Sequence, residues 1–143
     1  MRLITIDSSV FVSAARPSEI GYGESTAFLE WARRARPRLF LPTLVMVETA
    51  AALSRTGSEA GIAQQYGLAV GQLPNTVLVA LDEGLARQAA VLGAQHKLRG
   101  ADAVYLATAS LFAAELVTLD KEQLDRGAKI VRTLTPSDFV ATT

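Results

Sequence analysis

The sequence contains no cysteine, one histidine and no excess charge of either sign. Without cysteine, the protein has neither disulfide bonds nor thiolate metal ligands, and a cysteine nucleophile is excluded. A zinc site has little support because His96 has no second histidine to join it. Fourteen basic residues balance fourteen acidic ones, so any contact with nucleic acid has to be local. Metal chemistry in this chain therefore depends on carboxylates.

Long hydrophobic runs are also absent. No apolar segment approaches the length of a membrane-spanning helix without polar interruption, and the first one meets an acid too soon for a signal peptide. We therefore expect a cytoplasmic protein with no membrane partner. Half of the 143 residues are hydrophobic, which is enough for a sizeable core. Because linkers, repeats and low-complexity stretches are lacking, we expect a single domain over residues 1–143.

Two kinds of apolar segment alternate along the chain. Short runs rich in branched residues predict strands at 3–6, 39–41, 77–81, 116–118 and 130–131. Longer, alanine-rich segments predict helices at 8–15, 24–35, 43–56, 59–72, 83–97, 101–114 and 121–126. Strands that alternate with helices indicate an α/β fold with a parallel sheet covered on both faces.

Acidic residues mark several ends of these segments. In a parallel sheet, ligands gather at the carboxyl ends of the strands, where Asp7, Asp82 and Asp120 fall. Asp102 begins a long apolar helix, and Glu48 lies one turn into another. Structural roles are open for most of them: Asp7 suits a helix cap, Asp120 with Gln123 resembles a capping box, and Asp102 lies in a first turn. Glu48 is harder to explain this way, because a solitary carboxylate on an apolar helix is costly to bury.

Several carboxylates that converge at one sheet edge repel one another unless a cation lies among them. Oxygen ligands without histidine or cysteine suit hard ions such as Mg²⁺ or Mn²⁺. Such an ion activates water for attack on a phosphodiester. This interpretation fails if the acids lie on separate surfaces, or if arginines hold them and leave no room for a cation.

Four segments in order, IDSSVFVSA, LPTLVMVETAAAL, RGADAVYLATA and LVTLDKEQL, together with the closing TLTPSDF, resemble the PIN-domain ribonucleases. The resemblance is strongest to the VapC-type toxins of type II toxin–antitoxin systems. It implies a three-layer α/β/α fold whose five-stranded parallel sheet has the order 3-2-1-4-5. It also implies an Mg²⁺- or Mn²⁺-dependent endoribonuclease in which each segment supplies one catalytic acid: Asp7, Glu48, Asp102 and Asp120.

Further roles follow from the same resemblance. Asp7, Asp102 and Asp120 are expected to be metal ligands, and Glu48 a ligand or an orienter of water. A hydroxyl beside the first acid is expected from Ser9, in preference to Ser8, and a second hydroxyl from Thr118, for which a purely structural role is about as good. Asp82 is expected to cap a helix away from the site. The implied partners are RNA, a cognate VapB-like antitoxin and a second copy of the chain in a homodimer.

Two features leave alternatives open. Arg99 lies close to the expected site and is our candidate for an RNA contact, with an ordinary surface arginine as the alternative; the run from Arg33 to Arg38 is favoured as a solvated helix end. The strongest rival function is a non-catalytic PIN-fold module that binds RNA or protein.

Overall fold

The computed structural model describes all residues, 1–143, and its five strands form one parallel sheet in the order β3-β2-β1-β4-β5. The strands are β1 (Leu3–Ile6), β2 (Arg38–Pro42), β3 (Thr76–Val79), β4 (Glu115–Val117) and β5 (Thr133–Leu134). The sheet order predicted from the family resemblance is confirmed. Because the chain winds from β1 first toward β3 and then toward β5, the winding reverses between β1 and β4.

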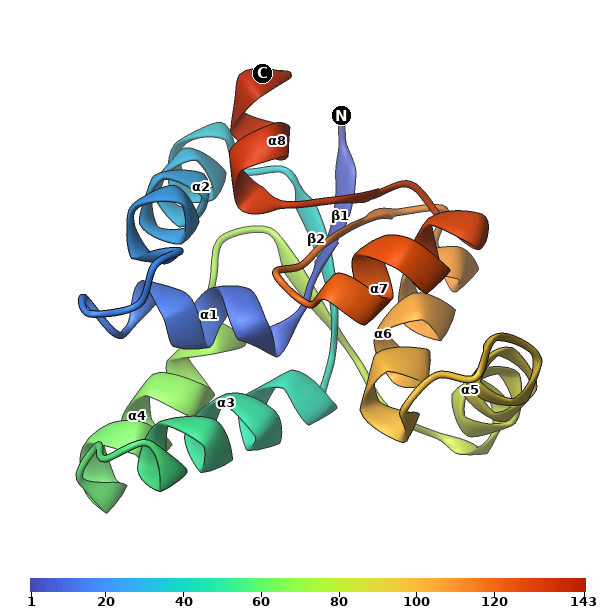
Figure 1. The fold of residues 1–143 in the computed structure, drawn as a ribbon, viewed down its shortest axis with the longest axis horizontal. Helices are drawn as coiled ribbons and strands as arrows, with labels where there is room; N and C mark the ends of the chain where they lie inside the picture. The colour runs from blue at the N-terminus through green and yellow to red at the C-terminus, as the bar shows by residue number, and fades with distance from the viewer.

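Helices cover both faces of this sheet. They are α1 (Ser8–Ala14), α2 (Tyr22–Ala35), α3 (Leu44–Arg55), α4 (Ala60–Val70), α5 (Glu83–His96), α6 (Gly100–Leu111), α7 (Lys121–Arg126) and α8 (Pro136–Ala141), with a 3₁₀ turn, η1, at Gly127–Lys129. Figure 1 shows α1, α2 and α4 on the left of the strands and α5 and α6 on the right. The fold is therefore the expected three-layer α/β/α arrangement.

The core is built around the central strand. Ile4 and Ile6 of β1 are fully buried, as is Thr5 on the opposite face, because helices cover both sides. Helix α6 is buried along eight consecutive residues from Asp102 to Ala109, since it packs against the sheet on one side and α5 on the other. A polar side chain near the start of this helix is thus held rigidly.

Helices α3 and α4 approach each other closely. Gly67 of α4 faces α3, and a Cβ added there would lie 2.7 Å from the Met46 carbonyl oxygen and 2.8 Å from the Ala50 Cβ. Glycine is required here because any side chain would push the two helices apart. This contact fixes α3, which carries Glu48.

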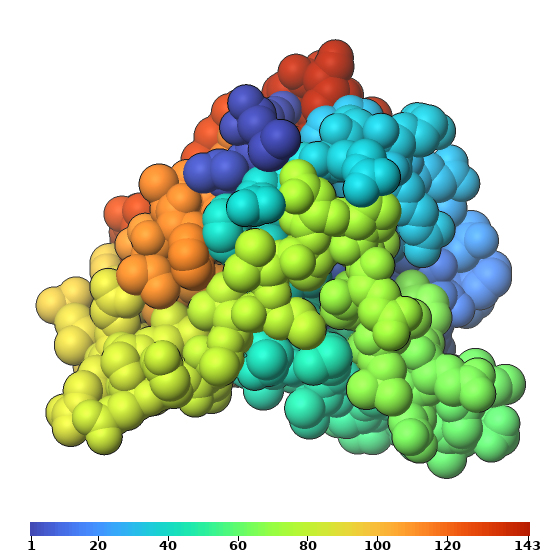
Figure 2. All heavy atoms as spheres, turned by 180° about the vertical axis from the view of Figure 1, so that it is seen from behind, coloured from blue at the N-terminus to red at the C-terminus, as the bar shows by residue number.

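The edge strand β3 is only partly covered. Leu78 is exposed, and Figure 2, the view from behind, shows the yellow-green segment around β3 crossing the surface without a helix over it. Asp82 follows β3 and caps α5 by accepting a hydrogen bond from the Leu85 backbone N–H at 2.9 Å. The predicted cap is thus found.

One predicted strand is wrong. Residues 130–131 were expected to form the fifth strand, but β5 begins at Thr133. The backbone N–H groups of Ile130 and Val131 both donate to the carbonyl of Gly127, which closes the 3₁₀ turn. The branched side chains of Ile130 and Val131 still pack against the core, although their backbone does not form a strand. Helix α8 was not predicted; Thr135 caps it through the Asp138 N–H.

No helix combines the length and apolar character that crossing a membrane requires.

Candidate active site

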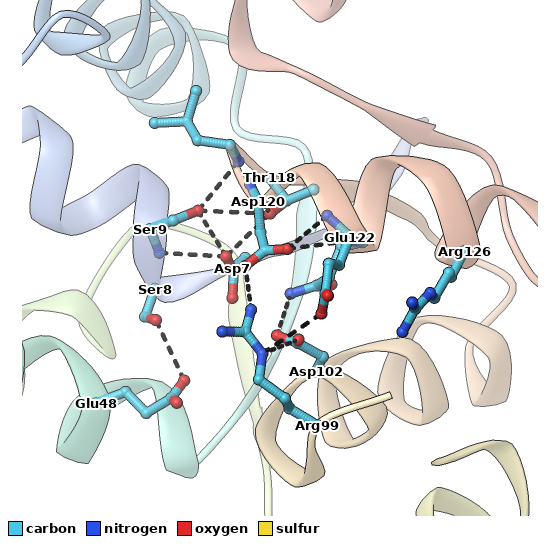
Figure 3. Close-up of polar contacts among 12 residues, drawn as sticks. Asp7, Ser8, Ser9, Glu48, Arg99, Asp102, Thr118, Asp120, Glu122 and Arg126 are labelled. Carbon is cyan, nitrogen blue, oxygen red and sulfur yellow. Dashed lines mark hydrogen bonds and ion pairs between the residues drawn. The ribbon is translucent and has the colours of Figure 1, made fainter. Parts of the chain in front are cut away.

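A pocket of about 780 Å³ opens at the carboxyl ends of β1 and β4, where the winding reverses. All four predicted acids line it, although they come from separate parts of the chain. Asp7 follows β1, Asp120 follows β4, Glu48 extends from α3 and Asp102 from the first turn of α6. The structure therefore brings together the four side chains that the sequence singled out (Figure 3).

Asp7 is the most buried of these acids, with 4% of its surface exposed. Its Oδ2 accepts hydrogen bonds from the Ser9 hydroxyl at 2.5 Å and the Thr118 hydroxyl at 3.0 Å. Each hydroxyl is held in turn by a backbone N–H, Ser9 by that of Leu119 and Thr118 by that of Asp120. Both predicted supporting residues thus contact Asp7, and they connect it to the segment that carries Asp120.

The environment of Asp7 raises its pKa from 3.8 to about 6, chiefly because burial removes the charged carboxylate from water. The hydroxyls of Ser9 and Thr118 oppose this rise, while the negative charges of Glu48 and Asp102 add to it. No cation lies within ion-pair distance of Asp7. Asp7 is therefore a buried acid whose negative charge is not compensated.

Glu48 is half-buried and held through one carboxylate oxygen. Its Oε1 accepts hydrogen bonds from the Tyr105 hydroxyl at 2.7 Å and from the Ser8 hydroxyl at 3.2 Å. Burial and the negative charges of Asp7 and Glu48 raise the pKa of Tyr105, so it remains a neutral donor. Oε2 of Glu48 forms no hydrogen bond within the protein, and can accept one from a water molecule or ligand.

Asp102 and Asp120 share one cation, Arg99. The Arg99 Nε donates to Asp102 Oδ2 at 3.0 Å, and its terminal NH₂ group donates to Asp120 Oδ2. A longer contact of 3.8 Å joins Arg99 to Glu122. Burial raises the pKa of the Asp102 carboxyl, and the hydrogen bond from Arg99 counteracts part of that rise. The Arg99 side chain is itself 64% exposed, so it lies over the acids from the solvent side.

Gln123 holds the other oxygen of Asp102. Its Nε2 donates to Asp102 Oδ1 at 2.9 Å, and its side chain is fully buried. The capping box that was the structural alternative for Asp120 does not form: Asp120 accepts from the N–H groups of Glu122 and Gln123, but the Gln123 side chain donates to Asp102. Asp120 is therefore both a helix cap and part of the pocket.

Tyr105 and Gln123 are site residues that the sequence analysis missed. Tyr105 lies one turn after Asp102 and was counted with the apolar helix, while Gln123 was assigned to a cap. The sequence did contain a signal for both residues. Each follows an expected site acid by one turn, and residues one turn apart lie on the same face of a helix.

The donor set fits a hard divalent ion in its chemistry, because the only ligands are carboxylate and hydroxyl oxygens and the buried Asp7 is uncompensated. No three acidic side chains lie close enough together to form a ready-made metal site. Arg99 holds two of the four acids, whereas Asp7 and Glu48 form no ion pair. A cation held by Asp102 or Asp120 would compete with Arg99, whose side chain is exposed and can move away.

The remaining candidates lie outside the pocket. The exposed arginines from Arg33 to Arg38 run from the last turn of α2 to the first residue of β2, at the amino ends of the strands, which is the edge opposite the acids. His96 ends α5.

Comparison with solved structures finds the same fold in several bacterial toxins. A toxin–antitoxin complex from Klebsiella pneumoniae matches with a TM-score of 0.66 and 21% identity over 93% of this chain and 97% of that one. VapC20 from Mycobacterium tuberculosis, a toxin that cleaves the sarcin–ricin loop, matches with a TM-score of 0.71 and 17% identity over 88% and 94%. VapBC2 from Rickettsia felis, bound to promoter DNA, matches with a TM-score of 0.67 and 12% identity over 92% and 98%. No curated protein matches the sequence significantly.

The sequence itself matches the PIN domain family model over residues 4–130. That range contains β2, β3, β4 and all but the first residue of β1, and it includes all four acids of the pocket. Since the match spans most of the chain, this protein belongs to the PIN domain family.

Proposed function

We propose that this protein is an endoribonuclease that uses Mg²⁺ or Mn²⁺ to hydrolyse RNA phosphodiester bonds in the acidic pocket. The observation that carries the proposal is the convergence of Asp7, Glu48, Asp102 and Asp120, from four separate segments, at one sheet edge. Family membership supports it. Maintaining a buried carboxylate without a cationic partner costs stability, and a function that uses the charge explains why it is kept.

In the proposed reaction, a divalent ion supplies positive charge for the phosphate oxygens and makes a nearby water more acidic. Asp7, Asp102 and Asp120 are the residues proposed to hold it. Ser9 and Thr118 keep Asp7 oriented through their hydroxyl groups. Tyr105 and Ser8 fix Oε1 of Glu48, so that Oε2 can accept a hydrogen bond from the attacking water.

Arg99 has two consecutive roles in this proposal. In the metal-free protein it neutralises Asp102 and Asp120. If Asp102 and Asp120 held a divalent ion, the Arg99 guanidinium would no longer be needed to neutralise them and would be free at the rim of the pocket. There it can contact an RNA phosphate, because a guanidinium donates several hydrogen bonds in one plane.

We further propose that the chain is a single domain that acts in the cytoplasm as the toxin of a toxin–antitoxin pair, as a homodimer restrained by a VapB-like antitoxin. The fold shared with a toxin–antitoxin complex and with an RNA-cleaving toxin supports this assignment. A small gene directly upstream that encodes a DNA-binding antitoxin is the expected genomic context.

The test is RNA cleavage by purified protein. Cleavage is expected with Mg²⁺ or Mn²⁺ and not in excess chelator, and the Asp7→Asn variant is expected to lose it while remaining folded. Asp125→Asn is the matched control, since Asp125 is exposed on α7 and forms no hydrogen bond through its side chain. Cleavage that continues in chelator, or in Asp7→Asn, would overturn the assignment.

One observation favours a second candidate, a PIN module that binds RNA or protein without turnover. Arg99 neutralises two of the four acids, and no group of three acids is preformed for a metal. For such a module, purified protein would bind RNA, yet leave it intact at every Mn²⁺ concentration, and Mn²⁺ would not raise its melting temperature.

A further inference from the structure

A second recess lies at the other end of α7 from the acidic pocket. Its volume is about 230 Å³, and it is lined by Gln95, His96, Lys97, Arg126 and Lys129, without any acidic or apolar residue. We call these five residues the basic recess. Three of them carry a full positive charge, and they come from two segments about 30 positions apart in the chain.

These charges are not neutralised. Lys97, Arg126 and Lys129 form no ion pair, whereas Arg99, a neighbour in the chain, pairs with the acids of the pocket. The Arg126 guanidinium donates to the Lys97 carbonyl oxygen at 2.6 Å, which holds the two segments together. Three unpaired cations in one concavity repel one another, and an anion would relieve that repulsion.

The basic recess is connected to the acidic pocket in two ways. The segment from Lys97 to Arg99 runs from one to the other, and α7 has Asp120 as its N-cap and Arg126 as its last residue. A helix of this length spans about 9 Å. Figure 3 shows that Arg126 and Glu122 extend from the same side of α7, and that Arg99 and Asp102 lie next to Glu122.

Helix dipoles explain part of the positive charge of the basic recess without a ligand. His96 and Arg126 each lie in the last turn of a helix, where a cation interacts favourably with the helix dipole. The dipole does not explain why Lys129, from η1, faces the same concavity. If the helix dipoles were the whole explanation, removing these cations would lower the stability of the protein without changing RNA binding. The experiment below measures the two effects separately.

We propose that the basic recess binds backbone phosphates of the same RNA strand whose scissile bond lies in the acidic pocket. This inference rests on the proposed function. In this proposal the strand lies along α7, with the scissile phosphate at Asp120 and neighbouring phosphates at Lys97, Arg126 and Lys129.

The test compares two charge-reversal variants in the Asp7→Asn background, in which the RNA stays intact. The recess variant is Lys97→Glu/Lys129→Glu, and both lysines are exposed. The control is Arg36→Glu/Arg34→Glu, which changes the charge equally at two exposed arginines on the opposite edge of the sheet. The match is close because Lys97 and Arg36 each follow the last residue of a helix in the left-handed conformation, with φ of 56° and 52°.

Binding of a short fluorescein-labelled single-stranded RNA is measured by anisotropy across a salt series. The recess variant is expected to bind at least about tenfold more weakly than the background protein, and its salt slope is expected to fall by about 1.4 for two lost phosphate contacts. The control is expected to stay within about twofold. If charge reversal unfolds the recess variant, Lys97→Gln/Lys129→Gln gives the same comparison.

Equal losses in both variants, no loss in the recess variant, or a lower melting temperature with unchanged RNA binding would overturn the inference. Stronger binding of duplex DNA than of RNA would do so as well, because the basic recess would then serve another ligand. Cleavage by the unmodified protein is scored separately. RNA binding at the recess without any cleavage would leave this inference standing while the proposed nuclease activity fails.

Discussion

Replacing Asp7 with asparagine is expected to make the metal-free protein more stable at pH 7.5, although it removes the proposed activity. Asp7 is 4% exposed and has no cationic partner, and its pKa is raised from 3.8 to about 6. Above pH 6 the folded protein therefore holds a carboxylate that is more stable in the unfolded chain. Asparagine keeps an oxygen for the hydroxyls of Ser9 and Thr118 and carries no charge.

The magnitude follows from the pKa rise. At 1.36 kcal/mol per pKa unit, a rise from 3.8 to about 6 corresponds to roughly 3 kcal/mol. Because the folded pKa is the higher one, this group's contribution to stability is complete below pH 3.8 and is lost as the pH rises through 6. The asparagine variant has no such loss. We therefore expect a gain of about 1 to 3 kcal/mol at pH 7.5 that shrinks as the pH falls toward 4.

Urea denaturation of both proteins, in chelator and at several pH values, measures this difference. Asp125→Asn is the control, and it is expected to change the free energy of unfolding by less than about 0.5 kcal/mol. Added Mn²⁺ is expected to stabilise the wild type, by about 2.7 kcal/mol at a hundred times its Kd, and the Asp7→Asn variant much less. A folded Asp7→Asn variant that is less stable than wild type at pH 7.5 in chelator would refute the reasoning, because Asp7 would then not be a penalised charge.

Three other substitutions test separate parts of the structure. Arg99→Gln removes two partly exposed ion pairs, each worth about 0.2 to 1 kcal/mol. Isothermal titration is therefore expected to show that the variant binds Mn²⁺ roughly two- to thirtyfold more tightly than the wild type. Weaker binding would contradict the proposed competition between Arg99 and the ion. Tyr105→Phe removes the hydroxyl that holds Glu48, and we expect kcat for RNA cleavage to fall by about tenfold or more while Mn²⁺ affinity stays within about twofold. Gly67→Ala places a Cβ 2.7 Å from the Met46 carbonyl, so the free energy of unfolding is expected to fall by about 1 to 3 kcal/mol without a change in Mn²⁺ affinity.

Several features were predictable because they depend on local patterns. Alternating strands and helices indicated a parallel α/β fold, and a strand that ends on Asp7 indicated where that acid would lie. The strand order came from the family resemblance, since periodicity does not specify which strands are neighbours. The fifth strand was misplaced because Ile130 and Val131 have side chains typical of strands. Their backbone N–H groups instead donate to the Gly127 carbonyl and form a turn.

The tertiary structure alone decided how the acids are paired. The sequence supplied Asp7, Glu48, Asp102 and Asp120, but hydrogen bonds between residues 21 to 111 positions apart determine which oxygens are occupied. Arg99 lies only three positions before Asp102, but its contact with Asp120 spans 21 positions and depends on the same packing. Local spacing determines which elements form and which residues end them, whereas contacts across the fold determine which side chains meet, because they depend on how those elements pack.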